Sequence, residues 1–212
     1  MKKLFIFIII AFTVLAAKAQ SSMESSKYPT QYQQFEDAQV FMALGDTINT
    51  KANIFLKNGH LYFLRNKLMM EADMNNVVAV QFKDRRYIKI DTLLAAVVGT
   101  YKDNQLLCSR MIDIQSYITL KKNAQVVTGL ELSLNNYINV QHIDTDLGDE
   151  EFPIHRIYFF YYNGKYVPVN DRELYKYIPK EKRSVFNNVT KMDEFDWYDE
   201  AWLMKLMKYI TL

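Results

Sequence analysis

Residues 157–169 read IYFFYYNGKYVPV, two apolar runs on either side of an Asn-Gly pair. Asn163 and Gly164 are suited to the positive φ angles of a tight hairpin turn, so this stretch predicts an antiparallel β-hairpin. The first run, residues 157–162, is apolar at every position, whereas a strand covered on one side only alternates with polar residues. We therefore expect the hairpin to be covered on both sides, or to present one aromatic face to solvent.

The segment before this hairpin shows a similar pattern from residue 50 onwards. Short apolar or alternating runs are separated by turn residues, and a second pair, Asn58-Gly59, again indicates a hairpin. Such short connections leave no room for crossover helices, so the sheet is expected to be largely antiparallel. Residues 35–49 fit a helix or a strand, and we favour a strand or an irregular lead-in. The expected strands span residues 50–56, 60–64, 77–82, 87–90, 93–98, 106–112, 117–120 and 126–134.

After the hairpin the pattern becomes that of helices. Asn170 and Glu173 fit a capping box that opens a short helix through residue 178, and Pro179 suits the first turn of a second. Asp196 is expected to cap a third helix with one apolar stripe, which we expect to pack on the aromatic hairpin or the end of the sheet. The same stripe also fits a partner-binding face. Its members are Trp202, Leu203, Leu206, Met207 and Ile210.

These patterns predict an α+β fold, with an antiparallel β-meander or partly closed barrel followed by three short C-terminal helices. Residues 35–169 form the β-rich domain, and residues 170–212 form the helical segment packed on the sheet. Residues 20–34 are rich in Ser, Gln and Tyr, and we expect them to be a flexible lead-in.

The first 19 residues have the pattern of a secretory signal peptide. Lys2 and Lys3 precede an apolar run over residues 4–17, which is too short to cross a bilayer comfortably. Ala17 and Ala19 fit the small-residue rule for signal peptidase, with Gln20 as the new N-terminus. No cysteine lies near this junction, so we expect a periplasmic or secreted protein, not a lipoprotein, without a transmembrane segment after cleavage.

The charge balance gives no reason to expect nucleic-acid binding. The sequence has 26 basic and 24 acidic residues, and three of the basic ones, Lys2, Lys3 and Lys18, belong to the signal peptide. The remaining 23 basic and 24 acidic residues give a net charge of −1. Such a chain lacks the overall positive charge that attracts nucleic acid or anionic lipid.

Cys108 is the only cysteine, so an internal disulfide cannot form and stability must come from packing. It lies within an apolar run that predicts a buried strand, where cysteine behaves as a small hydrophobic residue. The alternative is a nucleophile, which needs a histidine nearby in space.

Familiar catalytic and metal-binding patterns are missing from the sequence. The six glycines are not clustered as a phosphate-binding loop requires, and there is no G-x-S-x-G, H-E-x-x-H or C-x-x-C. Residues 142–151 hold five carboxylates, which suits either a calcium site or a solvated acidic loop, but their spacing does not fit an EF-hand. The sequence therefore assigns no catalytic, cofactor-binding or metal-ligating residue, and no cofactor.

The aromatic hairpin is the one candidate binding surface. Tyr158, Phe160 and Tyr162 share one face of a strand, and Tyr166 follows the turn. Such rings can stack on sugars or peptides, although aromatic strands more often belong to a core.

Three segments carry a resemblance to a known group of proteins: residues 166–174, residues 179–183 and Lys57-Asn58-Gly59. Together with the Ala19–Gln20 junction, they resemble uncharacterised secreted proteins of the Bacteroidota that combine a β-rich body with a short, charged helical tail. The resemblance implies export and brings no catalytic residue.

Three hypotheses for function follow. The first is a non-enzymatic protein of the cell envelope, or a secreted one, that binds a macromolecular partner of unknown identity. The second is a carrier with a small apolar ligand in a barrel cavity of roughly 300 Å³ or more. The third is a hydrolase of envelope or dietary polymers, which requires a cleft with converging ionisable groups.

Overall fold

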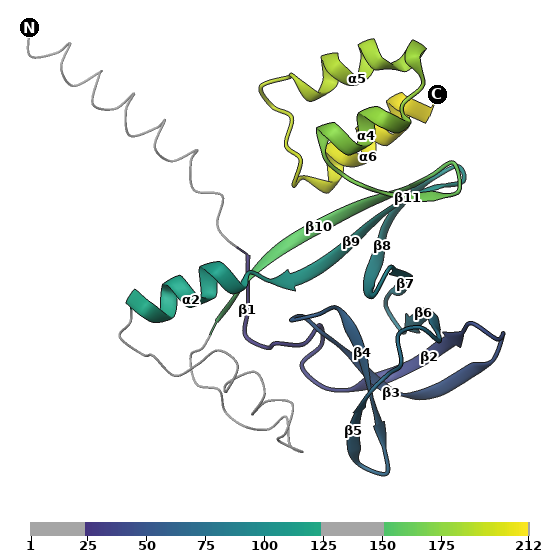
Figure 1. The fold of residues 1–212 in the computed structure, drawn as a ribbon, viewed down its shortest axis with the longest axis vertical. Coiled ribbons are helices and arrows are strands. Elements are labelled where there is room, and N and C mark those ends of the chain that lie inside the picture. The colour runs from purple at the N-terminus through teal and green to yellow at the C-terminus, as the bar shows by residue number, and fades with distance from the viewer. Residues whose placement is uncertain (1–23, 124–150, 212) are drawn as a thin grey trace, which may run out of the picture.

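A computed structural model of the protein describes residues 24–123 and 151–211 (Figure 1). The strands are β1 (Ser25–Ser26), β2 (Glu36–Met42), β3 (Thr47–Phe55), β4 (His60–Arg65), β5 (Leu68–Glu71), β6 (Val77–Phe82), β7 (Arg86–Ile90), β8 (Leu93–Tyr101), β9 (Asn104–Ile112), β10 (Phe152–Tyr162) and β11 (Lys165–Pro168). The helices are α2 (Ile114–Asn123), α4 (Asp171–Tyr177), the 3-10 turn η1 (Lys180–Lys182), α5 (Arg183–Thr190) and α6 (Glu200–Thr211).

All described strands form one antiparallel sheet in the order β1-β10-β9-β8-β7-β6-β2-β3-β4-β5, with β11 also paired to β10. The predicted antiparallel, broadly α+β architecture is confirmed. The strands follow one another as in a meander with two exceptions: β2 pairs with β6, and β1 pairs with β10. The sheet does not close into a barrel, because β5 at one end does not pair with β1 or β11 at the other.

The sheet nevertheless curls, so that the β3–β4 turn returns to the strands near its middle. The amide of Leu94 in β8 donates to the Gly59 carbonyl at 2.9 Å, and the amide of Ile112 in β9 donates to the Leu56 carbonyl at 2.8 Å. This curl gives the sheet an inner face. Because cross-strand partners share a face, the ladder defines one row across it: Tyr158, Cys108, Ala96, Tyr87, Val80 and Val40, all buried.

The C-terminal helices cover the β8–β11 end of this inner face (Figure 1). Leu206 and Met207 of the predicted α6 stripe are buried there against Leu106 and Phe160 of the sheet. Leu203 and Ile210 are buried with them, whereas Trp202 is only half-buried, so four of the five stripe residues are part of the core. Gly99 of β8 makes this close approach feasible, because a Cβ at this position would lie 2.5 Å from the Met204 sulfur.

Both predicted hairpins exist, with different turns. Asn163 and Gly164 have φ angles of 49° and 77°, as a two-residue turn with positive φ at both positions requires. At the other hairpin only Gly59 has a positive φ, and the loop between β3 and β4 is four residues long. A further hairpin, β4–β5, turns on Asn66 and Lys67 and is not among those predicted from the sequence.

The helix starts are partly as predicted. The Asn170 side chain accepts a hydrogen bond from the Glu173 amide at 2.9 Å, which confirms it as the cap of α4. For α6 the predicted cap, Asp196, is wrong. Asp199 accepts from the Ala201 amide at 2.7 Å, whereas Asp196 holds a turn earlier in the loop by accepting from Tyr198.

The strand predicted at residues 117–120 is wrong, because these residues belong to α2. The Asp113 carboxylate accepts from both the amide and the hydroxyl of Ser116, at 3.0 and 2.6 Å, and so caps the first turn. The expected strand at residues 126–134 lies outside the described residues.

Residues 24–34 are attached to the sheet, although we expected a flexible lead-in. β1 pairs with Phe152 and Pro153 of β10. Further along, the Leu56 amide donates to the Pro29 carbonyl at 2.8 Å, and Asn53 binds the backbone of Tyr32. The strand favoured within residues 35–49 is confirmed as β2, followed by the start of β3.

Candidate functional site

Two adjoining hollows on the helical end of the molecule form the candidate site. The first, of about 520 Å³, lies between α4 and α5 and is lined by Asp171, Tyr175, Asn187, Thr190, Lys191 and Trp197. The second, of about 450 Å³, is lined by residues 155–158 of β10, residues 168–171, Trp197 and Tyr198. Asp171 and Trp197 belong to both linings, and we call the two hollows together the Trp197 groove.

Packing holds the ring of Trp197 in place. It lies 4.9 Å from the Phe195 ring, edge to face, and 6.3 Å from the ring of Phe186, which is fully buried in the core. The indole itself is half-buried, and its neighbour Tyr198 is 69% exposed. A half-buried indole with its orientation fixed from the core side is pre-arranged to stack on a ligand, because little conformational freedom remains to be lost.

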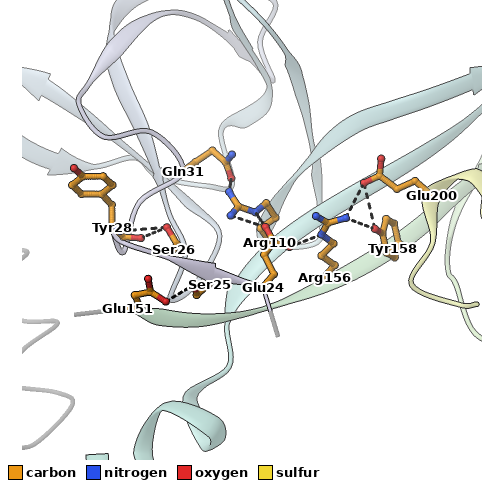
Figure 2. A network of polar contacts seen from close by, with 10 residues as sticks. All are labelled: Glu24, Ser25, Ser26, Tyr28, Gln31, Arg110, Glu151, Arg156, Tyr158 and Glu200. Carbon is orange, nitrogen blue, oxygen red and sulfur yellow. Dashed lines mark hydrogen bonds and ion pairs between the residues drawn. The ribbon is translucent and has the colours of Figure 1, made fainter. Parts of the chain in front are cut away.

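A network of charged side chains lies next to this groove on the inner face of the sheet (Figure 2). Arg110 and Arg156 stand directly opposite each other on β9 and β10, an arrangement that destabilises a sheet when like charges are not compensated. The Glu24 carboxylate bridges them, with one oxygen 2.8 Å from Arg110 Nη2 and the other 2.5 Å from Arg156 Nε. Glu24, directly before β1, is thus fixed to β9 and β10.

The other side of the network reaches the groove. Arg156 Nη1 lies 3.3 Å from the Tyr158 hydroxyl and 3.5 Å from Glu200 Oε1 (Figure 2). The Tyr158 hydroxyl in turn lies 3.3 Å from the Tyr198 carbonyl. Arg156 and Tyr158 therefore hold the loop that carries Trp197 and Tyr198, in addition to lining the second hollow.

Three ionisable groups of this network keep their protons. The pKa of Arg156 is raised by its hydrogen bonds with Tyr158 and Glu24, so the guanidinium stays charged. Burial raises the pKa of the Tyr158 phenol, which therefore remains a neutral hydrogen-bond donor. Burial also raises the pKa of the Cys108 thiol to about 12.

Cys108 has no histidine partner among the described residues. His155 projects from the opposite face of β10, since it pairs with Met111, whereas Cys108 pairs with Tyr158. His60 forms a separate pair with Glu71, with 2.5 Å between Nδ1 and Oε1. The protonated, buried thiol fits the expectation of a small core residue and gives the nucleophile alternative no support.

One hollow on the described inner face is smaller than the carrier hypothesis requires. Between Arg110, Arg156, Tyr87 and Glu200 it measures about 70 Å³, several times less than the roughly 300 Å³ at which ligand pockets begin. On the described inner face, buried side chains of β2, β3, β4 and β6 to β8 pack into one cluster, and an open hollow of about 570 Å³ lies beside it along β2, β3 and β6.

The structure separates the four residues of the predicted binding surface. Tyr158, Phe160 and Tyr162 are buried beneath the C-terminal helices, so they belong to the core. Tyr166 is 38% exposed, but it pairs with Tyr161 and therefore lies on the opposite face of the sheet. These four side chains do not form one surface.

Sequence reasoning missed the residues of the groove. Trp197 and Tyr198 lie in a segment without helical or strand periodicity, and the available signal was the cluster of three aromatic residues, Phe195, Trp197 and Tyr198, in an otherwise polar loop. Glu24 and Arg156 had no sequence signal, because 132 positions separate them.

Metal ligation finds no support in the described part of the chain, where no group of three or more His, Cys, Asp or Glu side chains is arranged to hold an ion. The acidic segment 142–151 lies outside the described residues except for Glu151, which accepts a hydrogen bond from Ser25 at 2.7 Å. Within residues 24–123 and 151–211, no helix combines the length and the apolar character needed to cross a membrane.

Comparison of the chain with protein-family models, with curated proteins and with solved structures finds no match.

Proposed function

We propose that this protein is exported and acts, without catalysis, by binding a macromolecular partner in the cell envelope or outside the cell. The observation that carries the proposal is the Trp197 groove, an open site whose central ring is fixed by the core and whose volume lies in the range of ligand sites.

The surroundings of the groove support a binding role. Tyrosine is enriched at protein interfaces because it offers a large contact area with one polar end. Four exposed tyrosines lie on the helical end of the molecule: Tyr175, Tyr177, Tyr198 and Tyr209. Such rings in water cost free energy that a partner would recover on covering them.

The experiment compares the partners captured by two tryptophan variants. Purified chain from residue 20 onwards is immobilised and exposed to envelope extract, once as the native sequence, once as Trp197→Ala and once as Trp202→Phe. Trp202 is the second tryptophan of the chain and lines neither hollow, so it serves as the matched control.

We expect Trp197→Ala to lose the partner that the native chain and Trp202→Phe retain. Circular dichroism and thermal unfolding establish that each variant is folded before the comparison. Equal capture by all three proteins would show that the groove is not the binding site.

A further inference from the structure

We propose that the Trp197 groove binds a saccharide chain, an assignment that rests on the proposed binding function and names its ligand class. The hollow between α4 and α5 is lined by two aromatic and four polar residues, without any aliphatic side chain. This combination matches sugar rings, which offer a C–H face on one side and hydroxyl groups around the rim.

The aromatic residues match the C–H face of a sugar. The face of an aromatic ring carries negative charge density, so it attracts polarised C–H groups that stack on it. Trp197 is fixed by Phe186 and Phe195, and Tyr175 lies 6.0 Å from Phe186 with the Arg183 guanidinium 4.6 Å over its ring. Both rings line the hollow and are held by these contacts, although the Arg183 guanidinium covers one face of Tyr175.

The polar residues match the hydroxyl rim. Asp171 accepts hydrogen bonds, Lys191 donates them and Asn187 does both, as an array of hydroxyl groups requires. The Thr190 hydroxyl donates to the Phe186 carbonyl at 3.0 Å and can accept from a ligand. One acidic and one basic side chain balance in charge, which favours a neutral sugar in this hollow.

Two other occupants fit less well. An amphipathic helix needs a groove of aliphatic side chains for its apolar anchors, and this hollow has none. An extended peptide that adds to a sheet needs a free strand edge, and the hollow between α4 and α5 offers none; a strand, β10, lines only the second hollow.

The second hollow extends the site along a chain. It shares Asp171 and Trp197 with the first hollow and adds hydrogen-bonding residues, among them Asn170, His155 and Arg156, beside the aliphatic residues Ile157, Pro168 and Val169. A saccharide longer than one ring can therefore pass Trp197 and contact both hollows.

The test uses Trp197 as its own reporter, since the chain has only two tryptophans. In the Trp202→Phe variant all indole emission comes from Trp197. This variant is titrated with neutral hexasaccharides (cello-, malto-, xylo-, manno- and chitohexaose) and with polysaccharide purified from the envelope. We expect a saturable change in emission with at least one of these probes.

Calorimetry on the native chain then measures the affinity for that probe and its dependence on the groove. We expect Trp197→Ala and Asn187→Ala to weaken binding at least tenfold, in line with the loss of one stacking contact or one set of hydrogen bonds. Tyr209→Ala, an exposed tyrosine of α6 outside both linings, is expected to bind as the native chain does.

The results separate the two proposals. If no saccharide changes the emission of Trp197 while Trp197→Ala still loses its captured partner, the groove binds another class of molecule and the saccharide assignment is overturned. If no saccharide changes the emission of Trp197 and Trp197→Ala also keeps every captured partner, both proposals fail.

Discussion

Cys108 lies on the inner face of β9, where burial raises the pKa of its thiol to about 12. The thiolate is the reactive form of cysteine, so we expect native protein at pH 8 to resist a thiol reagent and denatured protein to react at once. A colorimetric thiol titration with and without guanidinium chloride measures this difference. Equal reaction rates in both states would contradict the burial of Cys108.

The buried thiol of Cys108 also predicts that the stability of the fold depends on pH. Between about pH 9 and pH 12 the folded chain keeps a proton on Cys108 that the unfolded chain releases. The free energy of unfolding should therefore fall with rising pH over this window, by about 1.4 kcal/mol per pH unit for one proton. In Cys108→Ala the free energy of unfolding should fall less steeply over this window. Below pH 8 the free energies of the two proteins should depend on pH in the same way.

The negative charge of Glu24 compensates the positive charges of Arg110 and Arg156. The substitution Glu24→Gln removes this charge while keeping the shape of the side chain. We expect a loss of about 1–2 kcal/mol in the free energy of unfolding, because Arg110 and Arg156 are left facing each other. Partial exposure of the three side chains keeps the loss below that of a fully buried pair.

Urea unfolding of Glu24→Gln and of a matched control measures this contribution. The control is Asp37→Asn, which breaks an ion pair with Lys51 at 3.2 Å on the exposed surface and should leave the midpoint unchanged. Similar midpoints for Glu24→Gln and Asp37→Asn would show that the bridge in Figure 2 does not stabilise the fold.

At the scale of elements, the β3–β4 turn depends on Gly59. Its φ is 70°, and a Cβ at this position would lie 2.7 Å from the Leu93 Cβ. Gly164 in the β10–β11 turn has a similar φ of 77°, but a Cβ there would meet no atom within 4 Å. The two glycines thus share the backbone conformation and differ in the space around them.

We expect Gly164→Ala to cost about 1 kcal/mol, from the positive φ alone. Gly59→Ala should cost at least about 2 kcal/mol, because the turn must also move away from β8 and weaken the bond from the Leu94 amide. Thermal unfolding of the two variants measures the difference. Equal losses would show that the β3–β4 turn does not pack on β8.

The elements also show which patterns sequence reasoning can use. The Asn163-Gly164 turn, the Asn170 cap and the α6 stripe were predicted because each depends on neighbouring residues. Residues 117–120 were assigned as a strand because they are apolar and partly β-branched. The Asp113 cap and the packing of Tyr117 on Phe152, with 5.4 Å between ring centroids, make them part of a helix.

For the whole molecule, the limit of sequence reasoning is long-range pairing. β2 pairs with β6, although three other strands lie between them along the chain, and no local pattern encodes this pairing. The Trp197 groove likewise combines residues from β10, α4, α5 and the loop before α6. The aromatic hairpin was predicted correctly as a hairpin. The helices that cover it bury three of its rings in the core, and the groove forms beside the hairpin instead of on it.

The first 19 residues decide whether the whole chain is exported. If residues 1–19 are a signal peptide, the full-length gene expressed in a Gram-negative host should yield protein outside the cytoplasm whose intact mass equals that of residues 20–212. Ala19→Phe places a bulky side chain where signal peptidase requires a small one, so this variant should remain as the uncleaved, membrane-associated precursor. A variant without residues 2–19 should stay in the cytoplasm. Full-length protein recovered uncleaved from the cytoplasm would exclude export, and with it a partner in the envelope.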